Sequence, residues 1–302
     1  MENTKNPLLC DPETGACELP QADSAEKITL AKLETTAAQI TYFTDPICSS
    51  CWGIEPQLRR LKLEFGNQIH IDYRMGGLLP DWSYNSGGIS KPSDVAAHWD
   101  EVSPYYDMPI DGTIWLEDPL WSSYPPSIAY KAVQMQSPEK AGAFLRIIRE
   151  MVFLEKKNIC KWEHLSAAAS SLNLNVEQLK LDMESQAKAH FEQDLKLART
   201  SGVRAFPTLF FGEGINASVL VGARPYEQMK SLLLKQYPKL EAMPYSKEWD
   251  YLFTKFPSLT AREFAEISGK ERKQAEAELQ QLTTAGKLQE FKTRNGSIWR
   301  KK

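Results

Sequence analysis

The sequence predicts an α/β domain with a long helical insertion, followed by a small C-terminal α+β module. Three observations support this prediction. A strand–helix–strand pattern spans residues 40–73, with two cysteines where the helix begins, and helical periodicity runs through an insertion at about residues 81–200. An Asn-Gly turn signal lies close to the C-terminus. The 302 residues, 42% of them hydrophobic and 25% charged, are typical of a globular protein and suffice for two ordinary domains.

The strand–helix–strand unit begins with the β-prone run 40–43, which is followed by turn residues. Cys48 and Cys51 then open a helical stretch over 54–65 with apolar residues on one face. The alternating run 69–73 predicts a second strand after this helix. The cysteine pair is therefore expected at a helix N-terminus that directly follows a strand.

This placement favours redox chemistry at the cysteine pair. One helical turn separates Cys48 from Cys51, so the two sulfurs can close a disulfide. Free N–H groups and the helix dipole are expected to lower the pKa of Cys48, making it the nucleophile, while Cys51 resolves the mixed disulfide. The alternative, half of a zinc site, needs two further ligands, and the four histidines show no paired spacing. We predict neither a metal nor an organic cofactor.

A second candidate element is Pro207, which directly precedes another β-prone run. It resembles the cis-proline that thioredoxin-type sites place opposite their cysteines, where exposed backbone groups can pair with a substrate strand. The alternative is an ordinary trans proline that enters a strand. With Cys48 and Cys51, Pro207 completes the predicted catalytic set, and substrate binding is predicted at Trp52, Phe206 and Thr208.

The insertion is expected to be irregular and aromatic at first, then helical, and residues 1–36 are expected to form a flexible tail. The predicted insertion helices span 127–135, 138–154, 160–171 and 175–201. Three interpretations stay open for Cys10 and Cys17 in the tail: two free thiols, a second redox pair that exchanges with the first, or a four-cysteine metal site. Cys160 is expected to be a small buried apolar residue.

Prolines 238 and 244 mark a linker between the α/β domain, residues 37–238, and a module over residues 245–302. Thr260 and Glu263 match a capping box, and Asn295-Gly296 predicts a hairpin after three short helices, which is the plan of a winged helix. The module holds 12 Lys and Arg against 8 Asp and Glu, yet its candidate recognition helix mixes both signs. We therefore expect intramolecular packing or protein docking rather than nucleic-acid binding.

Together these features resemble the DsbA-like, FrnE-like branch of the thioredoxin superfamily, and over the whole chain the YjbH (SpxH) family of adaptors. The resemblance is carried by Asp45-Pro46, Cys51-Trp52, Glu55-Pro56, Gly112-Thr113-Ile114-Trp115, Ser122-Ser123-Tyr124-Pro125, Lys156-Lys157-Asn158-Ile159 and the module from Trp249 to Trp299. The first resemblance implies thiol–disulfide exchange, and the second implies delivery of the regulator Spx to the ClpXP protease. The sequence departs from both patterns. Ser49-Ser50 lacks the histidine or proline of strong oxidants, and Cys10 and Cys17 stand where the adaptors have a His- and Cys-rich metal-binding segment.

We thus predict a thiol–disulfide oxidoreductase acting on protein or small-thiol substrates, with thioredoxin or glutathione as redox partner. The alternative is an adaptor or redox-sensing docking protein that presents a client to a protease. No apolar run reaches the ~20 residues that a membrane span needs. The start of the chain lacks a basic cluster followed by an apolar stretch, so we expect a cytoplasmic protein without membrane contact.

Overall fold

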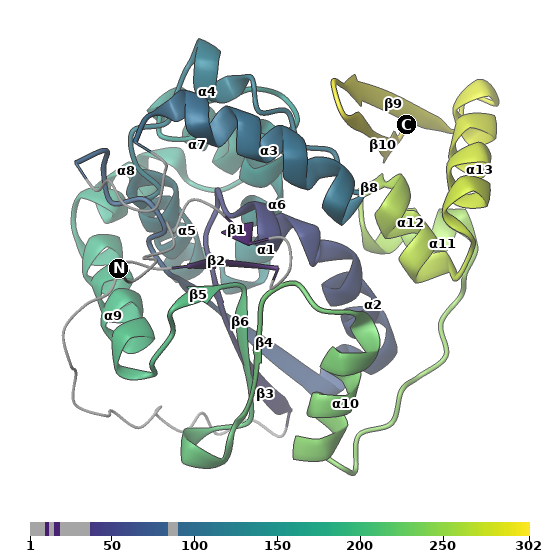
Figure 1. Ribbon diagram of the computed structural model, residues 1–302, viewed down its shortest axis with the longest axis horizontal. Helices are drawn as coiled ribbons and strands as arrows, with labels where there is room; N and C mark the ends of the chain where they lie inside the picture. Colours follow the sequence, from purple (N-terminus) through teal and green to yellow (C-terminus); the bar gives the residue numbers. More distant parts are fainter. Residues whose placement is uncertain (1–9, 12–14, 19–36, 84–89) are drawn as a thin grey trace, which may run out of the picture.

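The computed structural model describes residues 10–11, 15–18, 37–83 and 90–302. Figure 1 shows a central sheet with the insertion helices above and to the left of it, and the C-terminal module at the upper right beside α2 and α3. The remaining residues of the predicted tail lie outside the described part, so its predicted flexibility stays a prediction.

The central sheet has the strand order β4-β3-β6-β7. Its strands are β3 (Ala38–Thr44), β4 (Ile69–Met75), β6 (Thr208–Phe211) and β7 (Ser218–Val221). β3 runs parallel to β4 and antiparallel to β6, and β6 runs antiparallel to β7. Because β3 is central and covered on both faces, nearly all of its residues are buried.

The predicted first helix is divided in two, α1 (Ser49–Gly53) and α2 (Glu55–Phe65), at Ile54. Pro56 explains this break, because proline has no N–H with which to continue the helical hydrogen-bond ladder. The apolar face of α2, including Leu58 and Leu61, packs with α10 (Tyr226–Gln236) on one face of the sheet.

The insertion contains more helix than the sequence analysis predicted. Its helices are α3 (Pro92–Tyr106), α4 (Ile114–Glu117), α5 (Tyr124–Gln136), α6 (Pro138–Phe153), α7 (Trp162–Ser171), α8 (Val176–Glu184) and α9 (Gln186–Thr200). α3 and α4 occupy the stretch expected to be irregular. The single helix expected over 175–201 is broken at Ser185, whose backbone leaves the helical region at φ −132° and ψ −103°. The buried carboxylate of Asp194 ties α9 to the sheet by accepting from the Met75 N–H at 3.0 Å.

Part of the predicted tail is structured. β1 (Cys10–Asp11), β2 (Ala16–Glu18) and β5 (Ala205–Phe206) form a small antiparallel sheet in the order β1-β2-β5. β2 also contacts α1, so this N-terminal hairpin lies next to the cysteine-bearing helix in the middle of the molecule (Figure 1). Two short 3₁₀ turns, η1 (Gly66–Gln68) and η2 (Gly214–Asn216), complete the domain.

The C-terminal module has the predicted winged-helix-like plan. It comprises α11 (Trp249–Lys255), β8 (Ser258–Thr260), α12 (Ala261–Ser268), α13 (Arg272–Thr284), β9 (Leu288–Thr293) and β10 (Gly296–Lys301). The predicted capping box is present: Glu263 N–H donates to Thr260 Oγ1 at 3.2 Å, and Thr260 N–H donates to Glu263 Oε2 at 2.7 Å. β9 and β10 pair antiparallel around the Asn295-Gly296 turn, and β8 completes the sheet.

Charged side chains of the module contact the α/β domain. Arg272 Nε lies 2.8 Å from Asp107 Oδ2, and Arg294 Nη1 lies 2.9 Å from Asp100 Oδ2. α12 packs directly on α2. These contacts support the predicted intramolecular packing of the module. Within the described ranges, no helix is long and apolar enough to cross a bilayer.

Candidate redox site

Cys48 and Cys51 lie side by side at the start of α1. Cys48 is the N-cap residue of this helix, and its Sγ accepts a hydrogen bond from the Cys51 N–H at 3.1 Å. Both cysteines are free thiols, and both are 0% exposed. The predicted spacing and helix-start placement are therefore present, but the pair is completely covered.

The buried guanidinium group of Arg149 affects the charge of the cysteine pair. Arg149 of α6, 1% exposed, donates to Glu55 Oε1 at 2.7 Å, to Thr44 Oγ1 at 2.6 Å and to the Asp45 carbonyl at 3.2 Å. Burial acts to raise the pKa of Cys51, but a hydrogen bond from Cys48 and the charge of Arg149 outweigh it and lower that pKa.

The pKa of Cys48 moves in the direction opposite to our expectation. Burial raises it, followed by its interactions with Cys51. The helix N-terminus alone would lower this pKa, as predicted from the sequence. The structure differs because Cys48 is fully buried, with Cys17 of the N-terminal hairpin against it, and a thiolate without water is costly.

Asp45 is the second buried charged group of the site. Its carboxylate accepts from the N–H groups of Ile47 at 3.0 Å and Leu78 at 2.8 Å, and from the Ser123 hydroxyl at 2.9 Å. Burial raises the pKa of Asp45 to about 6 despite these donors. The carboxyl group therefore changes charge close to neutral pH, beside the Asp45-Pro46 turn that leads to the cysteines.

The Phe206–Pro207 peptide is cis, as predicted. The side chains of Phe206, Thr208 and Trp52 are buried at 0%, 2% and 0% exposure, so they line no open groove in this structure, and their role in substrate binding stays a prediction. The Phe206 ring fills space above Gly76, where an added Cβ would come within 1.7 Å of it. The backbone of Phe206, in β5, pairs with the neighbouring strand β2.

The residue of β2 opposite Phe206 is Cys17. Its Sγ lies 3.4 Å from Cys48 Sγ and 3.4 Å from Ser50 Oγ, and Ser50 Oγ is 2.6 Å from the Tyr106 hydroxyl. Cys17 is disulfide-bonded and 0% exposed. The interpretations as a free thiol and as a metal ligand therefore do not describe Cys17 in this structure.

Cys160, 6% exposed, donates to the Ser122 carbonyl at 2.8 Å, in line with the expected buried position.

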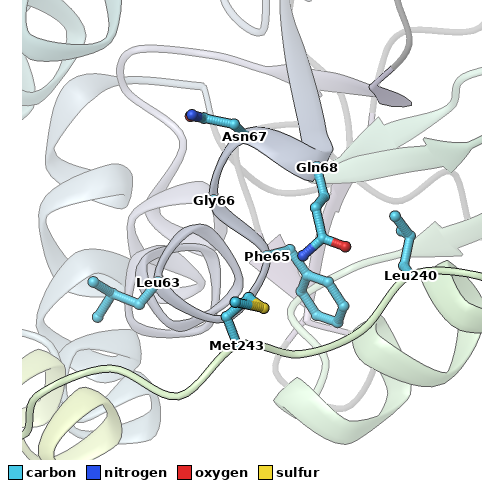
Figure 2. A pocket seen from close by; sticks show the side chains of 7 residues that line it. All are labelled: Leu63, Phe65, Gly66, Asn67, Gln68, Leu240 and Met243. Atoms are coloured by element: carbon cyan, nitrogen blue, oxygen red, sulfur yellow. The ribbon is translucent and has the colours of Figure 1, made fainter.

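A pocket of about 510 Å³ lies at the end of α2, where the linker passes. In Figure 2, linker residues Leu240 and Met243 face Phe65 and Gln68 across it. In the parts of the chain that the structure describes, no group of three or more His, Cys, Asp or Glu residues gathers to hold a metal.

The sequence analysis missed the roles of Arg149 and Asp45 in this site. Arg149 lies one turn after Leu145 and next to Ile148, both buried residues of α6. A charged residue on an apolar helix face was a signal that it meets a buried partner. Asp45 was considered only as a turn residue and as part of the family resemblance, because nothing local shows that its carboxylate is covered.

The βαβ unit, the cysteine pair and the cis-proline define a thioredoxin-like protein of the DsbA-like type. The sequence matches the thioredoxin family over residues 42–230, and the chain belongs to that family. It also belongs to the family of ClpXP adapter proteins SpxH. It is 32% identical to such a protein from Halalkalibacterium halodurans over 99% of both chains, and 27% identical to one from Bacillus subtilis over 87% of this chain and 88% of that protein.

Solved structures confirm the fold. A putative protein disulfide isomerase from Nitrosomonas europaea is 21% identical, with a TM-score of 0.59 over 67% of this chain and 98% of that chain. The cytosolic disulfide reductase DsbM from Pseudomonas aeruginosa is 20% identical, with a TM-score of 0.54 over 66% and 98%. At such identities these similarities concern the fold. The SpxH relative from Halalkalibacterium halodurans is matched over nearly the whole chain, C-terminal module included.

Proposed function

We propose that this protein is an adaptor of the SpxH type, which binds the regulator Spx and presents it to the ClpXP protease. The observation that carries the proposal is the 32% identity over 99% of both chains, which extends through the C-terminal module. The covered cysteine pair also favours this function over rapid turnover, because a thiol at 0% exposure cannot meet a disulfide in another protein. The comparisons thus favour the alternative of the sequence analysis over its main prediction.

The junction between the two parts of the chain suits a docking protein. Glu263 of α12 is fully buried between two guanidinium groups, at 2.8 Å from Arg59 Nε and 2.7 Å from Arg146 Nη1. Arg300 of β10 lies 2.7 Å from Glu150 and 2.9 Å from Glu155. Contacts of this kind hold the module against α2 and α6 in one orientation, so that both parts can contribute to a single binding surface.

Degradation of Spx by ClpXP, followed on gels over time, tests the proposal. Addition of this protein should accelerate degradation by about tenfold or more, equivalent to about 1.4 kcal/mol of improved client capture. The double variant Cys48→Ser/Cys51→Ser should retain the acceleration, as should Cys160→Ser, a control at the buried cysteine outside the pair. Degradation that proceeds at the same rate with and without the protein would overturn the proposal.

A second candidate function is the predicted thiol–disulfide exchange with protein or small-thiol substrates. It is favoured by the free Cys48 thiol at the N-cap of α1, with the lowered pKa of Cys51 beside it and the cis-proline at the adjoining strand. A glutathione titration with alkylation and mass spectrometry tests it. A reversible Cys48–Cys51 couple between about −120 and −270 mV, together with catalysed reduction of insulin, supports turnover. A pair that stays in one state throughout the titration contradicts it.

A further inference from the structure

We propose that the N-terminal hairpin β1/β2 is a disulfide substrate built into the chain, and that Cys48 attacks it at Cys17. The oxidised hairpin then hands its disulfide to the Cys48–Cys51 pair. This inference goes beyond both candidate functions, because the exchange takes place within one chain and needs neither a client nor an external disulfide.

The hairpin lies where a substrate strand pairs with a thioredoxin-like site. β2 adds antiparallel to β5, with Cys17 opposite Phe206, directly before Pro207. Main-chain pairing of an added strand is a common mode of peptide recognition. The chain thus supplies its own strand at the edge where the predicted substrate would bind.

The turn of the hairpin fits its place closely. Gly15 has φ +63°, and its carbonyl accepts from the Ala223 N–H at 2.6 Å. A Cβ at Gly15 would come within 2.8 Å of the Ala223 backbone, so both the backbone conformation and the space require glycine. This close approach indicates a specific docking position rather than incidental contact.

The two reacting sulfurs are in contact. Cys17 Sγ lies 3.4 Å from Cys48 Sγ, within the ~3 to 3.5 Å separation of a pair poised to react. Cys48 carries a free thiol, whereas Cys17 is already oxidised in a disulfide. The redox states are therefore those that exchange requires: a thiol nucleophile faces a disulfide sulfur.

We assign Cys10 as the disulfide partner of Cys17. Cys10 stands directly opposite Cys17 in the β1–β2 register. Residues directly opposite in an antiparallel pair have Cα atoms ~4.5 to 5.5 Å apart, which lies within the range that a disulfide spans. The chain has five cysteines, and Cys48, Cys51 and Cys160 are free.

The exchange balances without an external oxidant. Cys48 gives up its proton to solvent as its sulfur attacks Cys17, so a Cys48–Cys17 bond forms, the Cys17–Cys10 bond breaks, and Cys10 leaves as a thiolate that takes up a proton from solvent. Cys51 then gives up its proton and attacks Cys48, so a Cys51–Cys48 bond forms, the Cys48–Cys17 bond breaks and Cys17 leaves as a thiolate that is protonated in turn. The net result is oxidation of the Cys48–Cys51 pair and two-electron reduction of the hairpin.

A Cys51→Ala variant stops the exchange at its first step and provides the test. The full chain, with its hairpin oxidised, is incubated with N-ethylmaleimide, which captures the released Cys10 thiol, and is then digested and analysed by mass spectrometry. The expected product is a Cys17–Cys48 disulfide with Cys10 labelled. In Cys48→Ala, Cys17 and Cys10 should remain joined, and Cys51→Ala/Cys160→Ala should behave like Cys51→Ala.

Other products would overturn the inference. Labelled Cys48 beside an intact hairpin disulfide, or a Cys48 disulfide to Cys10, would show that Cys17 is not the sulfur attacked. The wild-type chain provides a second test, because its hairpin should lose disulfide at the rate at which Cys48 and Cys51 gain it. That rate should be independent of protein concentration, and a rate proportional to concentration would show exchange between chains. Failure of this inference would leave the Spx degradation assay unaffected.

Discussion

Replacement of Glu263 by glutamine should loosen the C-terminal module from the α/β domain. Glu263 is 0% exposed and lies between two guanidinium groups, those of Arg59 at 2.8 Å and Arg146 at 2.7 and 3.0 Å. The Arg59 contact is a charge contact rather than an aligned hydrogen bond. Glutamine keeps the size of the side chain and can still accept from the Thr260 N–H, so the substitution removes mainly the charge.

The expected loss in free energy of unfolding follows from the burial of Glu263. Removing one partner of a buried ion pair costs ~3 to 5 kcal/mol, because the remaining charge is left without compensation. Arg146 keeps two other carboxylates, Glu150 at 2.7 Å and Glu55 at 3.8 Å, which offset part of that loss. We therefore expect a loss of about 3 kcal/mol for Glu263→Gln, at the lower end of the range.

Urea unfolding and limited proteolysis of the linker, residues 238–244, measure this loss. In Glu263→Gln we expect a lower unfolding midpoint of the module and faster cleavage in the linker. The matched control is Glu276→Gln, which removes a carboxylate from the half-exposed pair with Arg272 at 2.9 Å and should cost ~0.5 kcal/mol or less. If Glu263→Gln and Glu276→Gln behave alike, the buried network does not hold the module and the reasoning fails.

Three further predictions concern the cysteine site. Burial raises the pKa of Asp45 to about 6, so protonation of its carboxyl group stabilises the fold fully below about pH 4, and this stabilisation is lost as pH rises through 6. Urea titrations should therefore show the free energy of unfolding of the wild type falling by up to about 3 kcal/mol relative to that of Asp45→Asn between pH 4 and 7. Parallel pH profiles of the two proteins would contradict this prediction. Gly15→Ala should displace the hairpin and speed alkylation of Cys48 by about tenfold or more, whereas an unchanged rate would mean that the hairpin does not cover the thiol. Arg149→Met should raise the pKa of Cys51, seen as a later onset of alkylation with pH in a Cys48→Ala background, and an unchanged onset would show that the guanidinium does not act on this thiol.

Local signals predicted much of the fold. The Thr260–Glu263 capping box and the Asn295-Gly296 turn are short-range features with a direct backbone consequence, and both are present. The break of the first helix at Pro56 was not predicted, although the missing N–H of this proline explains it. α3 was missed because its aromatic and polar residues show little periodicity and it contains Pro104.

The covered state of the site could not be predicted from the sequence. β2 and β5 are three and two residues long, too short to show a strand period, and about 190 positions separate their partners Cys17 and Phe206. Arg149 acts on Cys51 only because its side chain bonds Thr44 at the end of β3, which is a tertiary contact without a sequence motif. The chemistry of the pair was therefore predicted from local spacing, whereas its environment depends on long-range packing.

A substrate strand in the same chain changes what a thioredoxin-like pair can do. A tethered segment competes at an effective concentration on the order of millimolar, whereas a free protein disulfide at micromolar concentration occupies the same edge about a thousand times less often. Disulfide exchange with other proteins should be slowed by about that ratio while Cys17 stays docked beside Cys48. The redox state of the Cys48–Cys51 pair nevertheless depends on the redox state of its own hairpin. This arrangement suits a protein that binds a client and responds to oxidation better than one that turns over disulfides. Gly15→Ala separates the two possibilities, because insulin reduction that rises by the same factor as Cys48 alkylation would show that only the hairpin restrains an otherwise working oxidoreductase.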